Sequence, residues 1–590
     1  MYVLQVVPLS PTAPVSSLTY RSTVAFPRGA LVSVPLRKST VIGVVLESLS
    51  VREAKSLIKQ ATFELKKSDV VALGVLEEEL LALLEVEAMR SGASLGSVMR
   101  LLIRENHLSF AQNSEKSSAL FSEEYCEETL PERFLKYQEL IEKTSGVTLL
   151  VVPSRVEVAY AKSHFKAWKP YVVNAKTGEL PSDVRLIIAT PGEAFIPHPL
   201  LSLIILERVS AGSYKLLKRP FLDTRAFLKV LAKAQHATFV LGDFPIPLEL
   251  RPVPESALTS NHLFPTEVIN PTLEEAQSIF KPLTDSVQRS MHPVLDGGSA
   301  VVVLGSRKGY APGVVCRDCG MPVVDEFGRR LVFSVRGGVR VLKSADGSLV
   351  LSAKRVCDTC GSWNLMPVGL GVEQLEEYCR KQFPNARTVL VDPSRARSLK
   401  EVKVALSEGG TILVGTESML ALLPSLFKRG DLPLAVVASM DSLLSVPFWR
   451  ARERFVRNLL LLRTFAKKTL LTSRKKEDTV LTCALDTIPK AFFEEEASLR
   501  KALHFPPYGT LVLIECVGSE ERSLKEITLL SESLQKYEPS LLSSRRTKTG
   551  TRSALILHIH DVKDVGEAMA SILAVLPSYM AVHVDPETFW

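Results

Sequence analysis

LSLIILERVSAGSYK, residues Leu201 to Lys215, places an apolar run directly before two charged residues. The apolar positions 203–206 followed by Glu207 and Arg208 predict a buried strand that ends at a polar edge. Nucleotide-driven motor proteins end such a strand on an Asp that holds Mg²⁺, often with a second acid after it. Leu206 and Arg208 stand where those acids would be. The stretch therefore raises the question of whether a motor fold has kept its strand and lost its chemistry.

Strand-like and helical segments alternate on both sides of this stretch. VTLLVVPS, VRLIIATP and ATFVLGDF flank it, and a second series, SAVVVLGS, RTVLVD, TILVGT and LAVVAS, follows Gly297. Apolar strands that alternate with helices are typical of a mostly parallel α/β sheet. The sequence therefore predicts two consecutive α/β lobes, over residues 131–293 and 294–484.

Three further regions complete the predicted organisation. Residues 1–104 contain short β-rich runs and then two helical segments, which predict a small β-rich N-terminal domain. Residues 105–130 are polar and rich in Ser and Glu, as in a linker. Residues 485–590 combine strands with helices, so we expect an α+β C-terminal domain. The predicted fold class is a multidomain α/β protein.

Length and composition limit the class of protein. A chain of 590 residues exceeds what one core can hold, and 46% hydrophobic with 23% charged residues is ordinary for globular proteins. No apolar run approaches the roughly 18–20 residues that cross a bilayer, and the N-terminal MYVLQVVPLSPTAP lacks the basic start of a secretory signal. We therefore expect a cytoplasmic protein with no membrane partner. A net charge of +8 is compatible with polyanion binding without establishing it.

Four of the eight cysteines form two closely spaced pairs, CRDC at 316–319 and CDTC at 357–360, each followed by Gly. Two thiolates on such a turn can take adjacent corners of a tetrahedron, and a second pair closes it around Zn²⁺ at a Zn–S distance of about 2.3 Å. Eight cysteines in so long a chain do not suggest a disulfide framework. We predict a structural zinc site made by Cys316, Cys319, Cys357 and Cys360, in an insert at about 312–366. Two unrelated cysteine pairs in loops are the alternative.

From RKGYAPGVVCRDCG at 307–320 onward, the chain resembles the primosomal protein N′ family, the PriA replication-restart helicases. Further matches follow in the same order: GLGVEQLEEYC at 369–379, ILVGTES at 412–418, FWRARERF at 448–455, FPPYG at 505–509 and VDP at 584–586. The N-terminal half agrees more loosely, through LTYRS, ALVSVPLRKSTVIGVVLES at 30–48 and ASLGSVMRLL at 93–102. The resemblance implies a 3′-DNA-end-binding domain, two RecA-like helicase lobes, a cysteine-rich insert and a C-terminal domain.

The chain departs from the family's architecture at three places. Family members usually carry a winged-helix domain where this chain has only the polar linker. Their insert usually has eight cysteines for two zinc ions, with the outer two pairs sharing one ion, and this chain keeps only the outer pairs, so one Zn²⁺ is implied. In the family an acid from F-D-Y contributes to the pocket for a 3′ end, and here Thr19 replaces that acid.

Three parts of the family's ATP-hydrolysing site are missing. The dipeptide Gly-Lys, which a phosphate-binding loop requires, occurs nowhere in the chain, and the family's place for that loop holds EETLPE. The family's acidic quartet maps onto residues 206–209, which leaves one carboxylate and puts Arg208 where Mg²⁺ would bind. The arginine motif aligns with 461–468 and has Phe465 and Lys468 in place of its arginines. We therefore expect no ATP hydrolysis, and we assign no catalytic or nucleotide-binding residue.

Cationic and aromatic residues are the candidate DNA contacts, because Lys and Arg contacts to phosphates supply most sequence-independent affinity. Tyr214 and Lys215 would combine a stacking ring with a cation, which suits a single strand. Arg450, Arg454 and Arg457 share one helix face, although the neighbouring Glu453 favours a salt-bridged surface helix. The full candidate set is Arg37, Lys38, Tyr214, Lys215, Arg307, Lys308, Arg450 and Arg454, with an ordinary solvated surface as the alternative for each.

Three functions follow as hypotheses. The first is a nucleoid-associated replication-restart protein that binds forked or branched DNA without its own ATPase activity. The resemblance implies forked or single-stranded DNA, single-stranded-DNA-binding protein and primosome or helicase-loading proteins as its partners. The second is an active ATP-dependent 3′-to-5′ DNA helicase, which requires a phosphate loop that the sequence does not contain. The third is a protein-interaction scaffold that no longer binds DNA.

Overall fold

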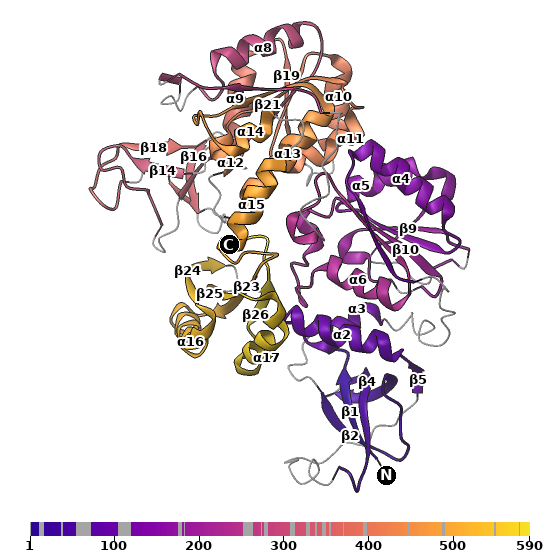
Figure 1. Ribbon diagram of the computed structural model, residues 1–590. Helices are drawn as coiled ribbons and strands as arrows, with labels where there is room; N and C mark the ends of the chain where they lie inside the picture. Colours follow the sequence, from indigo (N-terminus) through magenta and orange to yellow (C-terminus); the bar gives the residue numbers. More distant parts are fainter. Residues whose placement is uncertain are drawn as a thin grey trace.

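The structure is a computed structural model of the 590-residue chain (Figure 1). It describes residues 2–10, 17–36, 39–54, 72–103, 120–174, 180–181, 183–196, 198–251, 263–272, 274–275, 281–306, 313–325, 331–336, 339–344, 350–352, 356–369, 371–392, 398–444, 448–485, 490–547, 550–577 and 579–589. In the described part, no helix is long and apolar enough to span a membrane.

The N-terminal unit is a five-stranded sheet with paired neighbours running antiparallel, in the order β2-β1-β4-β3-β5. Its elements are β1 (Tyr2–Pro8), β2 (Leu18–Ser22), β3 (Ala30–Leu36), β4 (Ser39–Ser50), β5 (Ala72–Val75), α2 (Glu78–Arg90) and α3 (Leu95–Leu102). The strands alternate, so Val32 and Val45 face one small core while Leu31 and Val44 face another. That second core also holds residues of α2 and of the first α/β lobe, so the unit is packed onto lobe 1.

Lobe 1 is built on a six-stranded sheet in the order β6-β11-β10-β7-β9-β8, in which every pair of neighbours is parallel. The stretch 201–207 is the central strand β10, as its unbroken apolar run predicts. The elements are β6 (Ser122–Cys126), α4 (Leu130–Lys143), β7 (Val147–Val151), α5 (Arg155–His164), β8 (Tyr171–Val172), β9 (Leu186–Ala189), β10 (Leu201–Glu207), α6 (Thr224–Ala234) and β11 (Thr238–Gly242). Strand β6 lies inside the segment predicted as a linker, so lobe 1 begins before residue 131.

Lobe 2 repeats the parallel arrangement, in the order β12-β22-β21-β13-β20-β19. Its strands are β12 (Thr266–Ile269), β13 (Val301–Leu304), β19 (Arg387–Val391), β20 (Thr411–Gly415), β21 (Leu432–Val437) and β22 (Ala466–Thr472). Its helices are α8 (Asp285–Asp296), α9 (Val372–Gln382), α10 (Ser398–Glu408), α11 (Leu423–Leu426), α12 (Met440–Leu444), α13 (Ala451–Phe465), α14 (Thr479–Leu485) and α15 (Lys490–Ala502). Because β12 pairs with β22, and Phe492 of α15 lies in the core of lobe 2, this lobe extends beyond the predicted 294–484 at both ends.

Two smaller parts are attached to lobe 2 (Figure 1). The insert contains a two-stranded sheet of β14 (Gly313–Cys316) and β18 (Leu365–Val368), and a three-stranded sheet of β15 (Leu331–Arg336), β16 (Val339–Ser344) and β17 (Val350–Ser352). The C-terminal domain is a four-stranded sheet in the order β24-β25-β23-β26 with two helices: β23 (Thr510–Gly518), α16 (Glu520–Ser533), β24 (Ser540–Thr547), β25 (Gly550–Ile559), α17 (Val565–Val575) and β26 (Ala581–Val584). The whole agrees with the predicted multidomain α/β fold class.

Candidate functional site: the metal centre and the interlobe cleft

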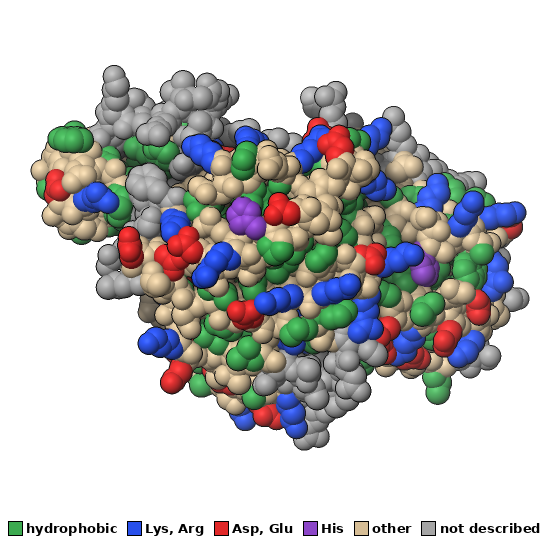
Figure 2. Space-filling model, turned by 90° about the horizontal axis from the view of Figure 1, so that it is seen from above, with side chains coloured by type: hydrophobic (Ala, Val, Ile, Leu, Met, Phe, Trp, Pro, Cys, Tyr) green, Lys and Arg blue, Asp and Glu red, His purple; other side chains and the backbone are tan. Residues whose placement is uncertain are grey.

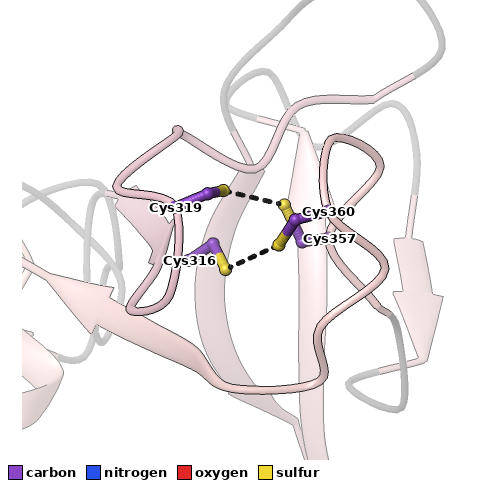
Figure 3. A group of neighbouring side chains, drawn as sticks. All are labelled: Cys316, Cys319, Cys357 and Cys360. Carbon is purple, nitrogen blue, oxygen red and sulfur yellow. Dashed lines mark hydrogen bonds between the residues drawn. The ribbon is translucent and has the colours of Figure 1, made fainter.

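The four predicted metal ligands meet in the insert (Figure 3). The Sγ atoms of Cys316 and Cys360 lie 3.5 Å apart, those of Cys319 and Cys357 lie 3.6 Å apart, and all four ligand atoms lie within 4.8 Å of one another. A tetrahedral zinc site with Zn–S bonds of about 2.3 Å has S–S edges of roughly 3.8 Å. The cluster therefore fits a four-thiolate zinc site.

The turns that present these thiols have matching backbone geometry. Gly320 and Gly361 have φ values of +73° and +71°, and their N–H groups donate to the carbonyls of Cys316 and Cys357 at 2.9 and 2.8 Å. Glycine suits both positions, because other residues are strained at such φ values. N–H groups of Cys360 and Thr359 lower the pKa of the Cys357 thiol to about 6, which favours the thiolate that a metal requires.

A cavity of about 970 Å³ lies between the two lobes. Lobe 1 contributes the start of α4 and the segments after β7 and β10, lobe 2 contributes α13, and the end of the chain contributes Glu587. Nine Lys or Arg residues and four Asp or Glu residues line it among those described. Thr129 and Leu130 are part of the wall, so the cavity adjoins the EETLPE segment that the resemblance predicts in place of a phosphate-binding loop.

The single remaining carboxylate of the acidic quartet is neutralised inside lobe 1. Glu207 accepts hydrogen bonds from Nε and Nη2 of Arg133 at 2.9 and 2.6 Å and from the Tyr137 hydroxyl at 2.7 Å. The Arg133 and Glu207 side chains are only 4% and 2% exposed. A Cβ on Gly242 would lie 1.6 Å from the Tyr137 hydroxyl oxygen, so only glycine leaves room for this contact. Burial, and the charge of Glu207 after it, raise the pKa of Tyr137 well above its ordinary value, so the hydroxyl remains a donor.

The other acids that line the cleft are also engaged. Arg208, at φ +48°, donates through Nε and Nη2 to Glu157 at 2.8 and 3.1 Å. Asp243 accepts from the backbone N–H groups of Ser210 and Phe244 at 2.7 and 2.8 Å. The remaining two, Glu417 and Glu587, pair with Arg454 and Arg450. In the described part of the cleft, every carboxylate therefore has a protein partner.

A cluster of buried charges joins the two lobes to the C-terminal domain. Arg450 contacts Glu249 of lobe 1 and Glu587 near the C-terminus, both at 2.7 Å. Arg500 of α15 contacts Glu453 of α13 at 2.7 Å. Although burial alone would raise it, the pKa of Glu453 is lowered to about 2 by Arg500, Arg457 and Arg450. We call Glu249, Arg450, Glu453, Arg500 and Glu587 the interlobe charge cluster.

Several predicted DNA contacts are structural residues instead. Tyr214 is fully buried, and its hydroxyl donates to the carbonyls of Val151 and Glu207 at 3.0 and 2.7 Å, so its ring is not available to stack on a base. Lys215 donates to the carbonyls of Val584 and Asp585, which attaches lobe 1 to the C-terminal domain.

The three arginines of α13 differ in their surroundings. Arg450 is 2% exposed and belongs to the charge cluster, which argues against contact with DNA. Arg454 has a 42% exposed side chain and lines the cleft beside Glu417, so its assignment stays a prediction. The helix carries salt bridges but is largely buried, unlike the surface helix suggested by its charges.

Other predicted positions are placed differently or not described. Arg37, Lys38, Arg307 and Lys308 lie outside the described residues. Thr19 lies on β2 opposite Gln5 of β1. Arg133 and Arg500 belong to these buried ion pairs, and no motif in the sequence indicated them. The sequence offers one indication for Arg133, which is its position directly after the EETLPE segment that replaces the phosphate loop.

Comparisons with known proteins found sequence relatives and solved structures of low similarity. No family model matches the chain. Solved structures with similarity include the DEAH/RHA helicase HrpB of Escherichia coli (12% identity, 65% of this chain and 44% of that one, TM-score 0.35), and RecG bound to a three-way DNA junction (10% identity, 76% and 48%, TM-score 0.32).

The curated relatives are replication restart proteins named PriA. Identity is 22% with the protein of Synechocystis sp. (68% of this chain, 53% of that one), 26% with that of Chlamydia trachomatis (69% and 58%) and 23% with that of Thermotoga maritima (76% and 65%). The chain thus spans between about half and two thirds of the length of these relatives.

The two parallel α/β lobes with a cleft between them define a protein of the RecA-like helicase fold. Along most of the chain, the sequence is similar to replication restart proteins named PriA, and this similarity indicates a family within the class. The chain belongs to the PriA family.

Proposed function

We propose that the protein is a replication-restart protein that binds forked or branched DNA and does not hydrolyse ATP. The proposal that the protein does not hydrolyse ATP rests on one observation. Every described carboxylate in the interlobe cleft is paired inside the protein, and Arg133 is bound to Glu207. Phosphoryl transfer requires cations and a metal arranged around the phosphates, and Mg²⁺ needs free oxygen ligands. The proposed role in replication restart is supported by the relatives, which are replication restart proteins.

The four-cysteine site in this proposal holds one Zn²⁺ with a structural role. All four corners of the tetrahedron are thiols of Cys316, Cys319, Cys357 and Cys360, so a bound ion would have no open position for a substrate. Bound zinc would fix the two turns and stabilise an insert whose small core is formed by few buried side chains, Val314, Val323, Leu331 and Leu342.

DNA contact is proposed for Arg37, Lys38, Arg307, Lys308 and Arg454. The face of the molecule in Figure 2 carries Lys and Arg side chains scattered among acidic and apolar ones rather than gathered in one patch. We therefore expect the DNA path to depend on several separate phosphate contacts. Proposed partners are forked or single-stranded DNA, single-stranded-DNA-binding protein and helicase-loading proteins, at the nucleoid.

The test is fluorescence anisotropy of the purified chain with a labelled fork and a matched duplex, over a salt series, with and without ATP. We expect tighter binding to the fork, weakening with salt and indifferent to ATP. Equal affinity for fork and duplex would reject fork recognition. Absence of binding at near-physiological salt would favour a protein-interaction scaffold, and fork-stimulated ATP hydrolysis would favour an active helicase.

The same assay tests the proposed contacts. Arg37→Gln with Lys38→Gln should weaken fork binding and reduce the slope of log K against log salt by about two, because each lost phosphate contact releases about one counterion fewer. The control is Arg380→Gln with Lys381→Gln at the exposed end of α9, where each cation already pairs with a glutamate. An equal effect in both pairs would mean that only net charge matters.

A further inference from the structure

The segment that follows β26, residues 585–589 (DPETF), contacts both lobes as well as the C-terminal domain. It leaves the C-terminal sheet at Asp585, places Glu587 between Arg450 of lobe 2 and Gly212 of lobe 1, and meets the C-terminal domain again at Phe589. We call residues 585–589 the strap. The two ends of the strap and its middle are held by different kinds of contact.

The first end of the strap is fixed by hydrogen bonds to the C-terminal sheet and to lobe 1. The N–H of Asp585 donates to the carbonyl of Leu511 on β23 at 2.7 Å, and the N–H of Leu511 donates to the Asp585 carboxylate at 2.8 Å. Lys215 of lobe 1 donates through Nζ to the carbonyl of Val584 at 3.1 Å and to that of Asp585. This end is therefore attached to both parts.

The other end is fixed by apolar packing. Phe589 packs against buried side chains of the C-terminal sheet, which are Leu511, Leu513, Ala554 and Ile556. Detaching an aromatic ring from such a cluster exposes apolar surface to water, so this end also favours the attached state.

The middle of the strap is held by two polar contacts with lobe 2. Nε1 of Trp449 donates to the carbonyl of Pro586 at 3.2 Å, and Nη1 of Arg450 donates to the Glu587 carboxylate at 2.7 Å. Glu587 also lies against lobe 1, because a Cβ on Gly212 would be 3.5 Å from the Cγ of Glu587. The ion pair between Glu587 and Arg450 is thus the main connection between the strap and lobe 2.

The same arginine joins lobe 2 to lobe 1. Nη2 of Arg450 lies 2.7 Å from Oε1 of Glu249. Next to Glu249 in the chain, the N–H of Leu248 donates to the Glu453 carboxylate of α13 at 2.9 Å. Arg450 is therefore shared by two interfaces, one with lobe 1 and one with the strap.

Arg450 can lose one of these partners without becoming an uncompensated buried charge. Its side chain is 2% exposed, and a buried guanidinium is costly when no anion is left beside it. If Glu249 leaves, it still has Arg500 at 3.5 Å, and if Glu587 leaves, it can reach water through the cavity that it lines. Glu453, 4.0 Å from Nε of Arg450, already accepts from Arg500.

We propose that Arg450 is a two-way switch between the lobe 1 interface and the strap. When the strap detaches, Arg450 keeps Glu249 and the two lobes stay together. When lobe 1 moves away, Arg450 keeps Glu587 and lobe 2 stays with the C-terminal domain. Each interface can open alone, and opening both at once is disfavoured. The inference involves no ligand, so it holds or fails independently of the proposed function.

A double-mutant cycle on the full chain tests the switch. Glu249→Gln and Glu587→Gln each leave Arg450 one carboxylate, so each should lower the unfolding temperature only slightly. The double variant leaves neither and should lower it by more than the sum of the two single shifts. In the control cycle, Glu567→Gln at the exposed start of α17 replaces Glu587→Gln, and its shift should be additive with that of Glu249→Gln. Additive shifts in the first cycle would overturn the proposal.

Exchange of two N–H groups with solvent shows which interface opens. The indole N–H of Trp449 reports on the strap and can be followed by ¹⁵N-tryptophan NMR, since the chain has four tryptophans. The N–H of Leu248 reports on the contact between the lobes and can be followed by mass spectrometry. Glu587→Gln should speed exchange at Trp449 about 10-fold, as expected for loss of a charge-assisted contact, and leave Leu248 protected.

Glu249→Gln should have the opposite pattern, with faster exchange at Leu248 and unchanged exchange at Trp449. Faster exchange at both groups in either single variant would mean that the two interfaces open together. Unchanged exchange at Trp449 in Glu587→Gln would mean that the ion pair does not hold the strap. Either result would overturn the switch.

Discussion

Glu207 illustrates what single residues decide in this molecule. The sequence placed a lone carboxylate at the end of a buried strand, and the structure gives it Arg133 and Tyr137 as partners, both from α4. A carboxylate at the same position in an ATPase faces a metal, whereas here it faces an internal cation. The chemistry of the position changed through its neighbours, while the acid itself remained.

Replacing this acid should destabilise lobe 1 strongly. Glu207→Gln leaves Arg133 buried without its counter-charge, and we expect a loss of about 3–5 kcal/mol in the free energy of unfolding of lobe 1. Urea unfolding followed by circular dichroism measures it. Glu124→Gln, an exposed acid on β6, is the control and should change little. Similar losses in both variants would mean that the buried Arg133–Glu207 pair contributes no more to the free energy of unfolding than an exposed acid does.

The metal centre gives a second prediction at this scale. Cys316→Ser with Cys360→Ser should lower the zinc content from about one ion per chain to near zero and increase proteolysis of the insert, because both turns lose a ligand. Atomic spectroscopy and limited proteolysis measure the two effects. Cys516→Ser in the C-terminal domain should keep the metal, and unchanged stoichiometry in the double variant would reject the ligand assignment.

At the scale of elements, the buried central strands were predictable and the polar edge strand β6 was not. Strands β7, β10, β13 and β20 are fully or almost fully buried, so their apolar runs are visible in the sequence. Strand β6 reads SEEYC, has one neighbour and carries exposed or half-exposed side chains, and so resembled a linker. The zinc ligands were predictable because their spacing is local. Arg500 was not, because two of its three partners, Glu249 and Glu453, are far away in the chain.

The contact between α2 and α6 should depend on pH. Glu87 on α2 lies near Asp223, the residue that caps α6, and burial, followed by the charge of Asp223, raises the pKa of Glu87 from 4.5 to about 7. The folded state therefore holds this proton more tightly than the unfolded chain. The contribution of Glu87 to stability is fully present below about pH 4.5 and is lost as the pH rises through about 7.

Unfolding temperatures measured between pH 5 and pH 8 check this. Glu87→Gln should remove part of the decline toward pH 8 and be more stable than the unmodified chain there, because a neutral amide resembles the protonated acid. Glu79→Gln, exposed on the same helix, is the control and should keep the decline. If the Glu87 variant follows the unmodified chain throughout, the carboxyl does not titrate in this range.

At the scale of the whole molecule, the interlobe charge cluster connects lobe 1, lobe 2 and the C-terminal domain. Lobe 1 contributes Glu249, lobe 2 contributes Arg450 and Glu453, and the C-terminal tail contributes Glu587. Trp449 adds a hydrogen bond to the Pro586 carbonyl at 3.2 Å and lies under the guanidinium of Arg500, 5.0 Å from ring centroid to Cζ. Such a buried network favours one arrangement of the lobes.

Removing its centre should loosen the molecule between domains. Arg500→Gln leaves Glu453 with less compensation, so we expect a loss of about 3–5 kcal/mol in unfolding free energy and faster hydrogen exchange in α13 and α15. Arg522→Gln, an exposed arginine of α16 paired with Glu526, is the control and should behave like the unmodified chain. Unchanged exchange in the Arg500 variant would show that the lobes are held by other contacts.

Because Gly242 has no side chain, the Tyr137 hydroxyl fits against it, and this contact affects any attempt to engineer ATPase activity into the protein. Grafting a phosphate loop alone would leave Tyr137 and Arg133 in the space beside Glu207. Removing those two first would expose a buried acid and unbalance lobe 1. Each intermediate on the route would be less stable than its parent, so the changes would have to be introduced together. The contact of Tyr137 with Gly242 therefore opposes a redesign that introduces the changes one at a time.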